Sequence, residues 1–195
     1  MHTPPNARRI KKSYCGQLSL TVNIALKQKH NSANDIPTAN LDLSIQFSDA
    51  LDTETRALLK PIFSKKNALK WLGWAIDPQA PHLEEITLRI VDKAEGLSVN
   101  KQFRGRAYAT NILTFNESQI LNTQADLLIC APVIIAEANE LGVSLREHCA
   151  HLLVHGALHA QGYDHEAGPE QELQMETLES LLMMSLGFED PYWDH

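Results

Sequence analysis

Hydrophobic and polar positions alternate in several short segments of this chain. Five segments carry a pattern typical of β-strands, in which neighbouring side chains point to opposite faces: 18–26, 41–47, 84–92, 111–116 and 126–130. The residues between the last two segments predict a hairpin-like loop. The pattern therefore indicates a sheet built from short strands.

Helical patterns separate and follow these strands. Residues 56–76, behind a cap at Thr53, predict a helix interrupted at Pro61, since proline lacks the backbone donor that a helix interior needs. Residues 93–103 predict another helix. With strands early and most helices late in the chain, the expected fold class is α+β, with a small mixed sheet packed against helices.

Three helices are expected in the last third of the chain: 133–141, 144–161 and 170–186. Gly142 and Gly187 follow the first and the third, at positions where glycine commonly ends a helix. Ser144 is followed three residues later by Glu147, the pair that caps a helix N-terminus. The middle helix carries the chemistry described below.

Length and composition are those of one globular domain. We expect residues 1–38 to be a basic, partly disordered extension and residues 39–195 to form a single domain. No apolar run approaches the ~20 residues that span a bilayer, and we expect no export, because the first residues are not followed by the apolar core of a signal peptide. Three cysteines, at positions 15, 130 and 149, are an odd number with no paired spacing, which favours a reducing compartment and a cytoplasmic location.

The charge of the chain is unevenly distributed. Its net charge is −7, but residues 1–38 carry six bases against one acid. An acidic protein is a poor match to nucleic acid, so charge alone is mildly against RNA as a ligand. A polyanion would have to bind the basic extension or the segment around Lys101, Arg104 and Arg106.

Three histidines within residues 155–165 have a spacing that suits one metal ion. His155 and His159 lie one turn apart on the expected helix, Gly162 supplies a left-handed turn, and His165 returns from beyond it. Three nitrogens on zinc leave one position open, as in catalytic sites. The spacing matches that of metzincin proteases, except that Gly156 replaces the glutamate that serves them as general base. The motif predicts zinc and argues against peptide hydrolysis.

Several neighbours of this motif have alternative roles. His148 and His151 continue the histidine stripe and could support the ligands, face RNA or form the polar edge of the helix. Asp164 could orient an imidazole or cap the turn. Gly156 could leave room for a phosphate or allow close packing on the sheet. The sequence does not separate these alternatives.

Residues 155–165, His-Gly-x-Leu-His-x-x-Gly-Tyr-Asp-His, resemble the signature of the YbeY family, bacterial endoribonucleases of ribosomal RNA maturation. Three further segments resemble the family in the same order: 103–115, 126–130 and 186–192. Together the matches cover residues 84–192. The departures are modest: Ala125 stands where the family usually has glycine, and residues 116–124 lack its common proline.

The resemblance implies a single-strand-specific endoribonuclease with one zinc ion held by His155, His159 and His165. It also carries the family's functional arginine onto Arg104, whose guanidinium matches a phosphate with two parallel hydrogen bonds. The implied substrate is the 3′ end of the 16S rRNA precursor in the 30S or 70S ribosome, with a role in ribosome quality control. Ribosomal proteins and assembly GTPases are candidate protein partners; DNA and membranes are not.

Two alternatives remain beside this interpretation: a zinc hydrolase similar to metallopeptidases, and a non-catalytic ribosome-assembly factor with structural zinc. The nucleophile is also open. A water molecule at the metal would give a linear phosphate, whereas the substrate's own 2′-hydroxyl would give a 2′,3′-cyclic phosphate. No residue of the sequence is marked as the general base.

Overall fold

The computed structural model describes residues 41–77, 83–116 and 124–193. The expected strand at 18–26, the basic extension 1–38 and Cys15 lie outside these residues. The described elements, in chain order, are β1 (Asp42–Phe47), α2 (Thr53–Ile62), α3 (Lys65–Ala75), β2 (Glu85–Val91), α4 (Lys93–Arg104), β3 (Ile112–Asn116), β4 (Gln124–Cys130), α5 (Ala131–Leu141), α6 (Leu145–Ala160) and α7 (Pro169–Leu186).

The four strands form one mixed sheet in the order β1-β2-β4-β3. The pairs β1–β2 and β2–β4 are parallel, and β3 runs antiparallel to β4. Leu88 of β2 lies between Ile45 of β1 and Leu127 of β4 in this register. The expectation of a small mixed sheet in an α+β fold is confirmed.

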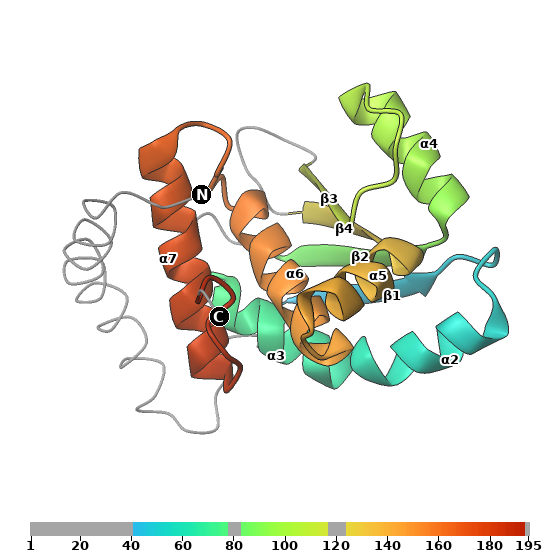
Figure 1. The fold of residues 1–195 in the computed structure, drawn as a ribbon, viewed down its shortest axis with the longest axis horizontal. Helices are drawn as coiled ribbons and strands as arrows, with labels where there is room; N and C mark the ends of the chain where they lie inside the picture. Colours follow the sequence, from blue (N-terminus) through green and yellow to red (C-terminus); the bar gives the residue numbers. More distant parts are fainter. Residues whose placement is uncertain (1–40, 78–82, 117–123, 194–195) are drawn as a thin grey trace.

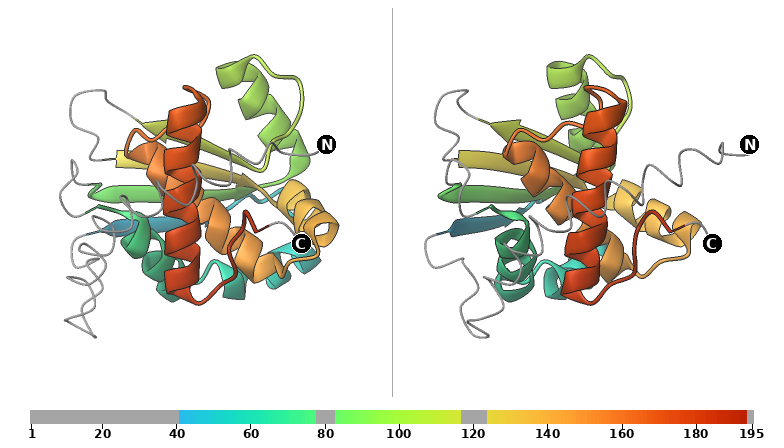
Figure 2. Two further views of the ribbon diagram at one scale, coloured as in Figure 1. Left: turned by 60° about the vertical axis from the view of Figure 1, so that its left-hand side comes forward. Right: turned by 90° about the vertical axis from the view of Figure 1, so that its left-hand side faces the viewer.

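Helix α6 is the centre of the helical layer. It packs on one face of the sheet, with α3, α5 and α7 around it (Figures 1 and 2). Leu153, Val154 and Ala157 are fully buried in this core, together with Trp71 of α3 and Met175 of α7. Because the helix is enclosed by the sheet and by other helices, residues projecting from it are held in fixed positions.

Gly156 lies where α6 comes closest to the sheet. A Cβ atom at this position would be 2.8 Å from Ile112 Cδ1, 3.1 Å from Leu127 Cδ2 and 3.3 Å from Thr114 Oγ1. A Cβ would therefore require the ends of the Ile112 and Leu127 side chains to shift, and a bulkier side chain would push α6 away from β3 and β4. Of the two explanations for this glycine, close packing is the one that these contacts support.

A smaller apolar cluster lies on the opposite face of the sheet. It contains Val91, Leu113, Leu128 and Cys130, and Val99 of α4 packs against it. Asp92 caps the start of α4 by accepting a hydrogen bond from the Glu95 backbone at 2.9 Å. This packing and capping fix α4 beside β3.

The helix break near residue 61 differs from the prediction. Pro61 belongs to the last turn of α2, and the chain leaves the helix at Phe63. Ser64 then caps α3 by accepting a hydrogen bond from the Asn67 backbone at 3.4 Å. The end of α2 is capped by Asn67 of α3, whose side-chain amide donates to the Pro61 and Ile62 carbonyl oxygens at 3.1 and 3.0 Å.

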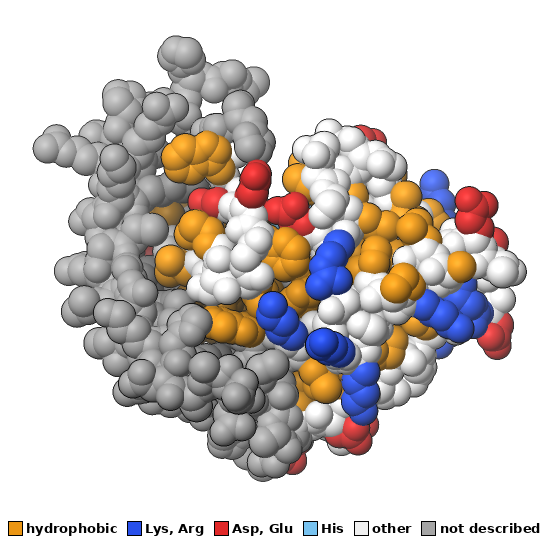
Figure 3. All heavy atoms as spheres, turned by 90° about the horizontal axis from the view of Figure 1, so that it is seen from below, with side chains coloured by type: hydrophobic (Ala, Val, Ile, Leu, Met, Phe, Trp, Pro, Cys, Tyr) orange, Lys and Arg blue, Asp and Glu red, His pale blue; other side chains and the backbone are white. Residues whose placement is uncertain are grey.

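One surface of this acidic chain is basic. The sequence from Thr55 to Ile76, which covers most of α2 and α3, contains no acid. Its exposed lysines are Lys60, Lys65, Lys66 and Lys70. Figure 3 shows Lys and Arg side chains gathered on this side of the molecule.

Within the described ranges, no helix is long and apolar enough to cross a membrane.

Candidate metal centre

The three histidines predicted as metal ligands lie together at the end of α6. His155 and His159 project from successive turns, and their ring centroids are 4.6 Å apart. Gly162 adopts φ +90°, and the chain turns back there so that His165 lies 5.2 Å from His155 and 5.1 Å from His159, ring centroid to ring centroid. One nitrogen from each ring lies within 4.8 Å of the others. This arrangement could hold a metal ion.

The ring orientations of two histidines are fixed by hydrogen bonds. Nδ1 of His159 lies 2.8 Å from the carbonyl oxygen of Tyr163. A carbonyl only accepts, so Nδ1 carries the proton and Nε2 keeps its lone pair. Nδ1 of His155 makes an equivalent contact, 2.8 Å from Oε1 of Glu179. Both rings therefore offer Nε2 as the ligand atom.

Glu179 of α7 lies behind these ligands, and no motif of the sequence predicted it. Its side chain is 1% exposed and also contacts His151 Nε2 at 2.6 Å and the Tyr192 hydroxyl. Burial raises the pKa of the Glu179 carboxyl, but hydrogen bonds from His151 and His155 outweigh it and hold that pKa below its ordinary value. Glu179 is therefore an anion that orients His155.

A sequence signal for Glu179 exists in retrospect. The buried apolar residues of α7 recur at helical spacing: Met175, Leu178, Leu182, Met183 and Leu186. Glu179 falls inside this stripe, where an apolar residue is expected. An acid at a core position is almost never buried without a partner, so it points to a buried cation or hydrogen-bond donor nearby.

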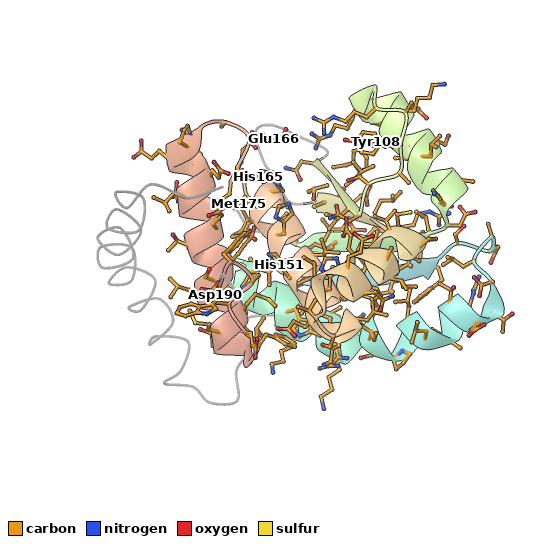
Figure 4. All side chains as sticks on the ribbon, viewed as in Figure 1. Tyr108, His151, His165, Glu166, Met175 and Asp190 are labelled. Carbon is orange, nitrogen blue, oxygen red and sulfur yellow. The ribbon has the colours of Figure 1, made fainter. Side chains whose placement is uncertain are left out.

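The remaining histidines of α6 have different roles. His151, which Figure 4 labels on α6, shares the Glu179 carboxylate with His155 and thus lies one contact behind the ligands. His148 instead lies 2.9 Å from Glu137 Oε2, and the same oxygen accepts a hydrogen bond from the Asn111 side chain at 3.1 Å. His148 therefore belongs to a separate network that fixes the start of β3.

The environment of His159 favours a neutral imidazole. Burial, followed by the nearby His155 and His165, lowers the pKa of His159, against smaller opposing effects of the Tyr163 carbonyl and Asp164. A neutral ring is the form that binds a metal.

Oδ1 of Asp164 accepts a hydrogen bond from the Glu166 backbone at 2.8 Å, so this carboxylate caps the turn.

A cleft of about 640 Å³ opens beside the triad. Residues of β3 form part of its lining, and its two sides are the end of α6 with the following turn and the end of α4 with the segment after it (Figure 1). Arg104 and Arg106 line it together with the histidines, whereas Lys101 does not. Gly105 ends α4 at φ +68° and separates the two arginines. The predicted arginine and the predicted ligands thus share one cleft.

Comparison with known proteins identifies the family. The family model described as Endoribonuclease YbeY matches residues 50–187. The chain belongs to the YbeY family. A relative from Polaromonas sp., named Endoribonuclease YbeY, is 45% identical over 160 residues, which is 82% of this chain and 99% of the relative. Another of the same name, from Albidiferax ferrireducens, is 48% identical over 152 residues, 78% of this chain and 97% of the relative.

Among solved structures, the solution structure of TM1509 from Thermotoga maritima resembles this YbeY chain with a TM-score of 0.40 and 20% sequence identity. The match covers 78% of this chain and 99% of that one. Family membership rests on the sequence matches, and it confirms the resemblance seen in the histidine signature.

Proposed function

We propose that this YbeY endoribonuclease holds a zinc ion with His155, His159 and His165 and cleaves single-stranded RNA beside it. Its proposed substrate is the 3′ end of the 16S rRNA precursor, in ribosome maturation and quality control. The observation that carries the proposal is the cleft itself: three imidazoles, two of them oriented by hydrogen bonds, and Arg104 line the same space.

The donor set fits zinc with an open position. Imidazole nitrogen is a preferred zinc ligand, and catalytic zinc sites use three protein ligands where structural sites use four. Among the residues described, only His155, His159 and His165 form a group of His, Cys or acidic side chains close enough to share an ion. This favours catalysis over a structural zinc. When bound, the metal would supply a Lewis acid for a phosphoryl oxygen.

Arg104 is the proposed phosphate-binding residue. It is exposed at the last turn of α4 and lines the cleft opposite the histidine turn. Cleavage of a phosphodiester concentrates negative charge on its non-bridging oxygens, and a guanidinium stabilises that charge with two hydrogen bonds. Arg104 would therefore act more strongly on the transition state than on the bound substrate.

Glu179 is a positioning residue in this scheme. It is almost fully buried behind His155, so it contacts the ligand and lies outside the cleft lining. As an anion it keeps the proton of His155 on Nδ1 and leaves Nε2 available. Its role is to hold a ligand in one orientation and one tautomer.

The net charge of −7 is mildly against RNA, but it does not describe the cleft of this chain. Charge acts locally, over a Debye length of about 8 Å in physiological salt. In the cleft, Arg104 and Arg106 stand against Asp164 and Glu166, so the chain's excess of acids is absent there. Local balance, with a metal cation added, decides whether a phosphate can enter.

The peptidase alternative loses support at Gly156. Metallopeptidases of matching spacing need a glutamate there, but a side chain at this position would meet Ile112 and Leu127 of the sheet. A buried carboxylate among these apolar side chains would be unpaired and costly. The packing of α6 therefore leaves no place for that general base.

The experiment joins metal analysis to RNA cleavage. Wild-type protein should contain one zinc per chain and cut a 16S 3′-end precursor; His159→Ala should lose both properties. Arg104→Ala should keep its zinc and fold but cut about 100-fold more slowly. Lys93→Ala, at the far end of α4, is the matched control and should cut normally. Full activity in both His159→Ala and Arg104→Ala would overturn the proposal.

A further inference from the structure

We propose that Tyr108 and Arg106 form a binding site for one unpaired nucleobase and its adjoining phosphate, on the wall of the cleft opposite the histidines. The inference rests on the proposed function, because it assumes that the polymer in the cleft is RNA. Neither residue is part of the metal centre or takes the role proposed for Arg104.

Tyr108 presents an aromatic ring to the cleft. Its side chain lines the same space as His155, His159 and His165, and the residue is 51% exposed. Figure 4 shows Tyr108 on the α4 side, with His165 and Glu166 across from it. A large aromatic residue left exposed in a cleft is suited to stacking, because every base has a flat π face.

The wall that carries Tyr108 is built before any ligand arrives. Asn100, which is 1% exposed, donates its side-chain amide to the Tyr108 carbonyl oxygen at 2.7 Å. The Gly105 backbone donates to the Lys101 carbonyl at 3.2 Å, and the Arg106 backbone donates to that of Asn100 at 3.4 Å. A ring on so constrained a backbone loses little entropy when a base stacks on it.

Arg106 is held next to this ring. Its Nη1 donates a hydrogen bond to the Tyr108 hydroxyl at 3.1 Å. The Tyr108 ring and the Arg106 guanidinium therefore lie side by side, at a spacing that can bind a base and the phosphate attached to its sugar. An aromatic ring beside a cation is the usual composition of single-strand RNA sites.

Glu166 forms an ion pair with Arg106 across the cleft. Its Oε1 lies 3.7 Å from Arg106 Nη2, and both side chains are more than half exposed, at 57% and 53%. Ion pairs this exposed contribute little stability, so a phosphate can replace the carboxylate at small cost. Since Glu166 directly follows His165, the pair joins the two sides of the cleft beside the metal site.

The site gives a physical reason for cutting single strands. A base can stack on Tyr108 only after it has left its own neighbours, which costs little in an unpaired segment and more in a duplex. The Tyr108 ring would then hold a nucleotide close to the one that is cut. Selectivity would come from binding, and the chemistry would stay with the metal and Arg104.

The test measures binding and cleavage separately. A short single-stranded oligoribonucleotide carrying 2-aminopurine is mixed with zinc-loaded protein; base stacking quenches its fluorescence before any cleavage. Tyr108→Ala should abolish the quench and raise KM about 10-fold, with kcat nearly unchanged. Tyr108→Phe keeps the ring and should retain both quench and KM. Glu166→Gln should lower KM, and Arg106→Gln should raise it.

A Tyr108→Ala protein that melts like wild type and keeps the wild-type quench and KM would overturn this site. Because the quench does not require cleavage, the two proposals fail differently. A wild type that quenches through Tyr108 but does not cut RNA would leave the nucleobase site standing and overturn the proposed function.

Discussion

Oε1 of Glu179 accepts a hydrogen bond from Nδ1 of His155 at 2.8 Å. This contact ties α7, which contributes no metal ligand, to the candidate metal centre on α6. The same carboxylate contacts His151 and Tyr192, so residues from α6, α7 and the segment after α7 meet at one buried anion. Substitutions in α7 that alter this carboxylate should therefore change the affinity of the candidate metal centre for zinc.

Replacing this carboxylate should weaken zinc binding while leaving the fold in place. Glu179→Gln keeps the shape of the side chain but removes the charge that fixes His155, and loss of such a partner typically costs about 10- to 100-fold in metal affinity. The measurement is competition for zinc with a chromophoric chelator. Glu172→Gln, exposed on the same helix, is the matched control; equal zinc affinity in both variants would show that Glu179 does not position the ligand.

Substitution of Gly156 by alanine and by valine should show how closely α6 packs on the sheet, through the free energy of unfolding. In Gly156→Ala the helix gains about 1 kcal/mol from better propensity, which offsets small shifts of the Ile112 and Leu127 side-chain ends. Gly156→Val adds bulk that those shifts cannot absorb and should lower the free energy of unfolding by about 1–3 kcal/mol. Urea unfolding measures both. If Val raised KM for RNA without lowering stability, room for a phosphate would explain the glycine better.

The contribution of Glu95, which joins α4 to Arg89 of β2 and to Ser48, to the free energy of unfolding should depend on pH. Burial raises the pKa of Glu95, but its hydrogen bonds with Arg89 and Ser48, at 2.6 and 2.8 Å, outweigh this and leave that pKa below its ordinary value of 4.5. A lowered folded-state pKa stabilises the protein above 4.5, and the gain is lost as pH falls through the folded value. Glu95→Gln should therefore cost about 1 kcal/mol at neutral pH.

The same substitution should cost progressively less in acid, because wild-type Glu95 is then protonated too. Urea unfolding of the two proteins across the acid range measures this convergence. A constant difference at every pH would mean that the charge of Glu95 is not what holds α4 to the sheet.

Local features of this fold could be predicted from the sequence, since their causes lie within a few residues. Ser144 does cap α6, accepting a hydrogen bond from the Glu147 backbone at 3.2 Å, and Gly142 and Gly187 end α5 and α7 in left-handed conformations. The histidine spacing likewise predicted that the three rings would meet. Each of these depends on backbone geometry over one or two turns.

Features that depend on contacts between distant segments could not be predicted. The insertion of β4 between β2 and β3 brings together strands separated by other elements. Glu179 forms a hydrogen bond with His155, 24 positions away in the sequence, and Arg106 forms an ion pair with Glu166, 60 positions away. The sequence shows that such a residue is unusual for its position but does not show which partner it meets.

Zinc titration into metal-free protein tests the central claim most directly. Metal-free wild type should not cut the 16S 3′-end precursor, and its activity should rise with added zinc and level off at one zinc per chain. His165→Ala, which lacks the ligand beyond the helix, should neither saturate at that ratio nor regain activity. Full cleavage by metal-free protein, or equal zinc dependence in His165→Ala, would contradict a zinc centre formed by these three histidines.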